Sequence, residues 1–299
     1  MDVKTPSRVI VTASDENYAH LCLGLVKSLG RWAKNMYVLD LGLTEPTRRQ
    51  MARLCAGVIP IPDTLWSPTG LEWPYLDAMT VRPQLPKIFD HEFIMWIDCD
   101  VWVQNRAAIP TYFRAAAENP ENFAITVTVD PEYPRVINNY IWYQETFLAS
   151  HTDYWGPEVA QQLFGKAIFN SGVMAASRNS PVWNAYMDGV ANLYTNNEKV
   201  RTTWALAHMA EQQSLNRVLH ESGLSTVLPA DYNWMSHAGP LRRRRFHVET
   251  LVGKRRPHVV HLADYRGHEA HYRENFLLYE SRPARLSRFV RQRFLRQTG

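Results

Sequence analysis

Two aspartates, Asp98 and Asp100, are the residues that most clearly offer chemistry in this sequence. They follow the apolar run Phe93 to Ile97, whose β-branched and aromatic residues predict a strand buried on both faces. Carboxylates beside a core strand need a partner, because removing water from an unpaired charge is costly. Residues i and i+2 of a strand point to the same side, so we expect both carboxylates to converge on one cation.

Oxygen ligands of this kind suit Mg²⁺ or Mn²⁺. The structural alternative is a pair of strand-end aspartates that cap the following turn, and an isolated Asp-x-Asp does not decide between the two. The choice depends on the elements that would hold the pair and on the other polar residues that those elements carry.

The first elements alternate between strand and helix. Apolar β-branched segments predict strands at 8–13, 36–41 and 58–61, and helical spacing predicts helices at 18–32 and 44–54 between them. This alternation is typical of a parallel sheet with crossover helices. Further strands are predicted at 93–97, 123–129, 167–176, 225–228 and 257–263, and further helices at 75–89, 181–194 and 202–221.

Two of these elements contain residues that interrupt them. Pro83 and Pro86 must break or kink the helix predicted at 75–89, because proline lacks the backbone donor and clashes with the preceding turn. Gly172 lies inside the strand predicted at 167–176. A glycine inside a strand often marks a bulge or the close approach of a ligand to the backbone.

The composition is that of an ordinary soluble globular protein, with 299 residues, 45% apolar and 21% charged. No apolar run reaches the length of a transmembrane helix, and the first residues lack the pattern of a signal peptide. Three scattered cysteines, Cys22, Cys55 and Cys99, indicate neither a disulfide framework nor a zinc site. We therefore expect a cytoplasmic protein.

Positive charge is concentrated at the C-terminal end. Residues 242–299 contain fifteen lysines and arginines against five aspartates and glutamates, a net charge of +10, so residues 1–241 carry −6 of the total of +4. We expect one domain over residues 1–270 and a basic amphipathic helical extension over 271–299. That extension would either lie on an anionic membrane surface or pack on protein. No nucleic-acid-binding module is recognisable, and no nucleic-acid partner is expected.

Five sequence blocks, taken in order, resemble the retaining glycosyltransferases of family eight. The first four are VTASDENYAHLCLGLVKSL at 11–29, MWIDCDVWVQN at 95–105, FNSGVMAAS at 169–177, and EQQSLNRVL at 211–219 followed by LPADYNW; the fifth and weakest is VVHLADYRG at 259–267. The resemblance covers most of residues 8–267. It implies a GT-A-type fold, which is a Rossmann-like α/β architecture with a mostly parallel central sheet flanked by helices.

The resemblance implies a metal site. Asp98 and Asp100 would bind Mn²⁺ or Mg²⁺ against the diphosphate of a nucleotide sugar, with His261 as the third protein ligand. An imidazole ligand is compatible with Mn²⁺ and less so with Mg²⁺. The structural alternative for His261 is a strand-end histidine satisfied by a hydrogen bond.

The resemblance also implies where the nucleotide lies. The base and ribose would follow the first strand and its turn, where a tyrosine ring can stack on a base and an aspartate can accept from a base N–H. The structural alternative is a helix N-cap at this turn with the tyrosine in the core, and both can hold at once. The matching residues are Thr12, Ala13, Ser14, Asp15 and Tyr18.

Further positions match residues around the donor sugar. Arg82 would bind phosphate or sugar hydroxyls. Asn170, Ser171 and Gly172 would contact the sugar. Gln212 would stand beside the anomeric carbon and stabilise a cationic sugar through its amide oxygen, while the leaving phosphate deprotonates the acceptor on the same face.

The chain departs from the family pattern at two places. Glu211 replaces an aspartate and is longer by one methylene, so its role stays open. In the fifth block, Asp264 stands where a glycine is expected, and Gly267 stands where a lysine that binds the diphosphate is expected. Arg266 or His268 could replace that lysine, and we assign Arg266 to donor binding.

Together these observations predict a metal-dependent hexosyltransferase. It would move a sugar from a nucleotide-diphosphate sugar, with uridine diphosphate as the first choice, to a glycan, lipid-linked or protein acceptor with retention of configuration. One alternative is a sugar nucleotidyltransferase, which needs a glycine-rich triphosphate loop that VTASDENYAH does not contain. The other is a catalytically degenerate sugar- or nucleotide-binding protein, which would explain the altered fifth block.

Overall fold

The computed structural model describes residues 7–71, 75–127, 148–236, 241–244, 247–250 and 253–263. Arg266, the rest of the fifth block beyond Ala263 and the whole of 271–299 lie outside these ranges. The division into a domain and a basic extension therefore stays a prediction. Among the described helices, none combines the length and the apolar character needed to cross a lipid bilayer.

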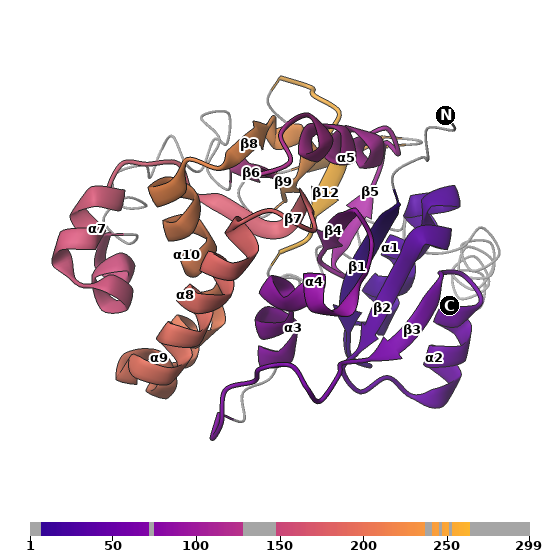
Figure 1. The fold of residues 1–299 in the computed structure, drawn as a ribbon. Coiled ribbons are helices and arrows are strands. Elements are labelled where there is room, and N and C mark those ends of the chain that lie inside the picture. The colour runs from indigo at the N-terminus through magenta and orange to yellow at the C-terminus, as the bar shows by residue number, and fades with distance from the viewer. Residues whose placement is uncertain are drawn as a thin grey trace, which may run out of the picture.

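A central sheet organises the described residues (Figure 1). Its strands are β1 (Arg8–Ser14), β2 (Met36–Asp40), β3 (Gly57–Pro60), β4 (Phe93–Ile97), β6 (Phe123–Val127), β7 (Phe169–Ser177) and β8 (Ser225–Leu228). They follow the order β3-β2-β1-β4-β7-β6-β8. The first four are parallel, β7 is antiparallel to both of its neighbours, and β6 and β8 are parallel. The mostly parallel sheet confirms the predicted fold class.

Helices cover both faces of this sheet. The described helices are α1 (Ala19–Leu29), α2 (Glu45–Ala52), α3 (Leu76–Val81), α4 (Leu85–Ile88), α5 (Ala108–Glu118), α7 (Pro157–Leu163), α8 (Val182–Asn196), α9 (Glu198–Thr202) and α10 (Trp204–Ser222). Figure 1 shows α8 and α10 together on one side of the sheet, with α1 and α2 on the other. Alternate residues of β1 point to opposite faces of the sheet. Val9 and Val11 pack with α8 and α10, whereas Ile10 packs with α1 and α5.

Short elements complete the described fold. The 3₁₀ turns are η1 (Gly30–Asn35), η2 (Arg82–Gln84) and η3 (Ala230–Tyr232). A small sheet joins β5 (Val101–Val103), β12 (Val259–His261) and β9 (Trp234–Met235). A hairpin joins β10 (Leu241–Arg243) to β11 (Val248–Thr250).

Two predicted interruptions are confirmed. The helix predicted before β4 is broken where α3 passes through η2 into α4, because Pro83 follows Arg82 directly. At Gly172 the sequence left a bulge or a close approach of a ligand open, and the structure agrees with the first, since the register between β6 and β7 shifts between Ile125, opposite Met174, and Thr126, opposite Asn170.

The predicted end of the strand at 97 is confirmed, but the strand alternation that we used to bring Asp98 and Asp100 together does not apply to them. β4 ends at Ile97, and residues 98–100 form the turn that leads into β5. β5 pairs with β12 in a different sheet. The sequence did not predict β5 as a separate strand, because an apolar pattern alone does not show which sheet a strand joins.

Candidate functional site

The turn between β4 and β5 places Asp98 and Asp100 at the carboxyl end of β4. Backbone bonds fix it from two sides. The Asp98 N–H donates to the Gly172 carbonyl at 2.7 Å, and the Leu262 N–H donates to the Asp100 carbonyl at 3.1 Å. Within the turn, the Val101 N–H donates to the Asp98 carbonyl at 3.1 Å. The two carboxylates converge because the chain turns, not because strand residues alternate.

Asp98, Asp100 and His261 form a cluster whose geometry suits a cation. His261 Nε2 lies 3.7 Å from Asp98 Oδ2 and 3.4 Å from Asp100 Oδ1, and one ligand atom from each residue lies within 4.8 Å of the others. Neighbouring ligands around a six-coordinate cation, with bonds of about 2.1 Å, lie roughly 3 Å apart. A β-carbon on Gly172 would stand 2.6 Å from Asp98 Oδ2, so glycine keeps this space open. The residues present therefore fit a divalent cation.

Asn233 fixes the orientation of the His261 ring. Asn233 Nδ2 donates to Asn170 Oδ1 at 2.8 Å, so Asn233 Oδ1 is left to accept from His261 Nδ1 at 3.1 Å. The lone pair of Nε2 then faces the carboxylates, as a metal ligand requires. Burial lowers the pKa of His261, but the negative charges of Asp100 and Asp98 outweigh it and raise the pKa above its ordinary value. The cluster thus attracts positive charge, whether on the imidazole or on a cation.

Arg82 is buried beside this cluster and joins two carboxylates. Its Nη2 donates to Asp98 Oδ1 at 2.6 Å, and its Nη1 donates to Glu211 Oε2 at 2.8 Å and to Ser171 Oγ at 2.9 Å. The guanidinium lies 4.9 Å from the ring centroid of Trp96, whose Nε1 donates to Asp98 Oδ1 at 2.7 Å. Protein donors therefore occupy Asp98 Oδ1, and Oδ2 faces the imidazole.

Glu211, whose role the sequence left open, is the buried partner of Arg82. Only 2% of the residue is exposed, and its Oε2 also accepts from Ser171 Oγ at 3.0 Å. Among the described residues, its Oε1 has no hydrogen-bond partner. Burial raises the pKa of Glu211 to about 7, although the charge of Arg82 acts in the opposite direction. This carboxyl group therefore holds a proton more readily than an exposed glutamate does.

Asn170 and Gln212 form a second buried network. Gln212 Oε1 accepts from Asn170 Nδ2 at 3.0 Å and from the Ser171 N–H at 3.3 Å. Asn170 Oδ1 accepts from the Gly172 N–H at 2.9 Å and from Asn233. Both lone pairs of the Gln212 amide oxygen are engaged, so stabilising a sugar cation through this oxygen requires one of these bonds to open.

No protein-family model matches the sequence, and no curated protein matches it. Solved structures share the fold at low sequence identity. The galactosyltransferase LgtC, in complex with donor and acceptor sugar analogs, gives a TM-score of 0.50 at 18% identity over 76% of each chain. Mouse xyloside xylosyltransferase 1 gives 0.50 at 15% identity, covering 86% of this chain and 97% of that one. The bifunctional glycosyltransferase WbbM gives 0.52 at 13% identity over 88% of this chain and 47% of its own, so the match spans about half of WbbM.

The chain has a GT-A-type fold. The segment that the resemblance assigns to the nucleotide lies at the carboxyl end of β1, where Thr12, Ala13 and Ser14 are buried. Ser14 Oγ donates to the Asp15 carbonyl at 3.0 Å, and Asp15 Oδ1 accepts from the Tyr18 N–H at 3.0 Å. Asp15 therefore holds the turn before α1, but the helix N-cap considered from the sequence is not formed at Ser14 or Asp15, because Tyr18 is the N-cap of α1 and makes no side-chain cap bond. Asp15 and Tyr18 are only half-buried, so they are the members of this set whose side chains face solvent.

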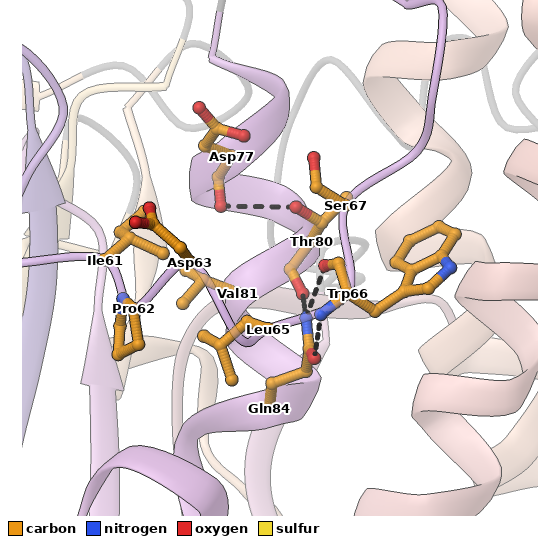
Figure 2. Close-up of a pocket in the computed structure, with 10 residues that line it drawn as sticks. All are labelled: Ile61, Pro62, Asp63, Leu65, Trp66, Ser67, Asp77, Thr80, Val81 and Gln84. Atoms are coloured by element: carbon orange, nitrogen blue, oxygen red, sulfur yellow. Dashed lines mark hydrogen bonds between the residues drawn. The ribbon is translucent and has the colours of Figure 1, made fainter.

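A cavity of about 320 Å³ lies beside α3 in this GT-A-type fold (Figure 2). The segment after β3 lines one side with Ile61 and Asp63, and α3 and η2 line the other with Asp77 and Gln84. Gln84 links the two sides, because its Oε1 accepts from the Trp66 N–H at 2.9 Å and its Nε2 donates to the Trp66 carbonyl at 2.8 Å. The amide of Gln84 is satisfied within the protein, so it points to no particular ligand.

Sequence reasoning missed two residues of the site. Asn233 orients His261, and Trp96 packs against Arg82 and bonds to Asp98. The block LPADYNW contains Asn233 and was the only signal for it, whereas Trp96 was counted with the buried strand. The structure joins the other predicted residues of the metal and sugar sites in one continuous network: Arg82, Asp98, Asp100, Asn170, Ser171, Gly172, Gln212 and His261.

Proposed function

We propose that the chain is a metal-dependent glycosyltransferase that moves a sugar from a nucleotide-diphosphate sugar to an acceptor with retention of configuration. The observation that carries the proposal is the convergence of Asp98, Asp100 and His261 around Gly172, beside the buried Arg82. The GT-A-type fold supports it, since the three solved structures named above are glycosyltransferases. We further propose uridine diphosphate as the nucleotide part, on the resemblance, and Mn²⁺ as the preferred cation, because of the imidazole.

The reaction needs positive charge where the sugar departs. Breaking the bond between the anomeric carbon and the phosphate oxygen leaves both electrons on the diphosphate. Asp98, Asp100 and His261 would hold a divalent cation, whose charge would stabilise this leaving group. Arg82 adds a guanidinium that Asp98 and Glu211 already hold in place, so little reorganisation accompanies the developing negative charge.

Retention places the acceptor on the face from which the diphosphate leaves. We assign removal of the acceptor proton to a phosphate oxygen, while the acceptor oxygen bonds to the anomeric carbon. Gln212 would stabilise the cationic sugar once its bond to Asn170 opens. Glu211 Oε2 accepts hydrogen bonds from both Arg82 and Ser171. These bonds favour a role for this carboxyl group in fixing the guanidinium, rather than in attacking the sugar.

The acceptor is proposed only by class, as a hydroxyl of a glycan, a lipid-linked sugar or a protein. A catalytically degenerate protein that binds a sugar or nucleotide is the second candidate. It is favoured by Asp264 and Gly267, which replace the glycine and lysine of the family pattern. The two candidates share the metal site and differ in turnover.

The test measures release of nucleoside diphosphate from a panel of nucleotide sugars in Mn²⁺, with EDTA as the metal-free condition. Asp100→Ala should abolish the release. Asp188→Ala removes an exposed carboxylate of α8 and should leave it unchanged. Wild-type turnover in Asp100→Ala would reject the metal site, and Mn²⁺-dependent nucleotide binding without turnover would favour the degenerate protein. The anomeric configuration of the product, read by NMR, decides between retention and inversion.

A further inference from the structure

Tyr75 has a backbone conformation that a tyrosine rarely adopts. Its φ is 66° and its ψ is 5°, and among the described residues Lys254 is the one other non-glycine with positive φ. A β-carbon makes this left-handed region unfavourable, so bulky residues occupy it only where their surroundings hold them there. Such residues cluster at ligand sites and hinges. The position of Tyr75 directly before α3 therefore calls for a physical reason.

The contact between Tyr75 and Tyr18 supplies that reason. Their ring centroids lie 5.4 Å apart with an interplanar angle of 79°, which is the favourable edge-to-face arrangement. Asp15 holds Tyr18 by accepting from its backbone N–H. Both tyrosines are half-buried, so part of each side chain faces solvent. The pair connects the turn after β1 to the start of α3 and offers two aromatic walls nearly at right angles.

These walls stand at the same edge of the sheet as the metal cluster. β1 and β4 are parallel neighbours, with Val11 opposite Trp96, so their carboxyl ends meet at one edge. Tyr18 follows β1 at this edge, and Asp98 directly follows β4. A ligand with a flat ring at one end and a diphosphate at the other would be able to contact both places.

We propose that Tyr75 binds the nucleobase of the donor, forming the second wall of a site whose first wall is Tyr18. This proposal rests on the proposed function, since it deepens the donor site. A heteroaromatic base that stacks on one ring meets the other ring at its edge, and aromatic rings favour both contacts. Tyr75 thus combines its left-handed backbone with the ring contact to Tyr18 at the point where the chain enters α3.

The placement also links base binding to the sugar site. Tyr75 precedes α3, and the same helical segment continues through η2, where Arg82 extends to Asp98 and Glu211. One short segment thus carries a base contact at its start and the guanidinium at its end. A diphosphate without a base would use only the second of these contacts.

The experiment compares Mn²⁺-dependent binding of uridine diphosphate and of pyrophosphate by calorimetry. Tyr75→Gly removes the ring while suiting the positive φ, and Tyr75→Phe keeps the ring. We expect Tyr75→Gly to weaken uridine diphosphate binding about tenfold, as loss of one aromatic stacking contact does, and to leave pyrophosphate binding unchanged. Tyr75→Phe should bind both like wild type.

Two control variants separate the alternatives. Lys254→Gly relieves the other positive φ of a non-glycine among the described residues, and Tyr37→Ala removes a half-buried ring that packs on Phe89 at the same 5.4 Å separation. Neither should change the ratio of the two affinities. An equal loss of both ligands in Tyr75→Gly, or no loss of either, overturns the proposal.

The affinities of the wild-type protein also distinguish failure of the base site from failure of the proposed function. Pyrophosphate binding equal to that of uridine diphosphate would reject the base site and leave the metal site intact. Absence of Mn²⁺-dependent binding for both ligands would reject the proposed function, and the base site with it.

Discussion

Gly172 lies so close to His261 that a β-carbon built on it would stand 2.4 Å from the His261 Cε1 atom. The same β-carbon would stand 2.6 Å from Asp98 Oδ2. The bulge in β7 thus brings backbone, rather than a side chain, against the cluster. Glycine is required at this position by close approach and not by a positive φ.

The first prediction follows from this contact. Gly172→Ala should weaken Mn²⁺ binding about 10- to 100-fold, the range seen when residues that position metal ligands are changed. Calorimetric titration with MnCl₂ measures it. Gly189→Ala is the matched control, because its β-carbon would approach Ser214 no closer than 3.3 Å. Unchanged affinity in Gly172→Ala would show that the cluster does not depend on the open space at residue 172.

The second prediction concerns the buried ion pairs of Arg82. Arg82→Met removes the cation between Asp98 and Glu211 and should lower the free energy of unfolding by about 3–5 kcal/mol, because both carboxylates lose the buried guanidinium that pairs with them. Glu211→Gln should cost less, since Asp98 still pairs with the guanidinium. Urea unfolding at pH 7 measures both. Equal losses in the two variants would contradict this account of the network.

The third prediction uses the proton on Glu211. Burial raises the pKa of this carboxyl from 4.5 to about 7, so the folded state binds the proton more tightly than the unfolded state. Its contribution to stability is fully present below pH 4.5 and is lost as the pH rises to 7. Glu211→Gln carries no titrating proton. Across this range, the stability of wild type relative to Glu211→Gln should fall by up to about 3 kcal/mol, measured by urea unfolding at each pH. A difference in stability between wild type and Glu211→Gln that stays constant with pH would refute this prediction.

The sequence predicted the architecture well because periodicity records which faces of a strand or helix are buried. β1, β2 and β3 begin and end close to their predicted bounds, and the strand-helix alternation gave the parallel half of the sheet. The separate strand β5 was missed for a physical reason. Residues on both sides of the turn are apolar, and only the pairing of Val101 with His261, far along the chain, assigns β5 to another sheet.

The sequence predicted the charged residues of the candidate site, but it did not predict the residues that orient them. Asp98 and Asp100 stand out because charge beside an apolar strand is rare. Asn233 and Trp96 have no such signal, since a buried asparagine and a buried tryptophan are each compatible with an ordinary core. The role of Asn233 depends on the meeting of β9, β12 and β7, and that of Trp96 on the approach of Arg82 from η2, both of which are long-range contacts.

The fourth prediction concerns His151, which lies outside the candidate site, and its effect on the stability of the fold in acid. Burial lowers the pKa of His151 to about 4, and His220 acts in the same direction. The unfolded state then binds a proton that the folded state does not, so stability is full above pH 6.5 and is lost as the pH falls toward 4. His151→Phe should reduce that acid loss by roughly 1–3 kcal/mol. Urea midpoints at pH 5 and pH 7 test this, and an identical drop in variant and wild type would contradict it.

The fifth prediction concerns the choice of cation. Ligand binding to the folded state raises the thermal midpoint by mass action, and a cation at 100 times its dissociation constant adds about 2.7 kcal/mol. Two carboxylates with one imidazole favour Mn²⁺ over Mg²⁺. MnCl₂ should therefore raise the midpoint at lower concentration than MgCl₂, and EDTA should reverse both shifts.

His261→Asn tests the origin of that preference. It replaces the imidazole by an amide and should narrow the difference between the two cations, because a carbonyl oxygen suits Mg²⁺ better than a ring nitrogen does. Asp100→Asn, which removes a charge but keeps the imidazole, should weaken both cations while leaving Mn²⁺ ahead. If His261→Asn prefers Mn²⁺ as strongly as wild type does, His261 does not bind the ion. The metal site would then consist of the two aspartates alone.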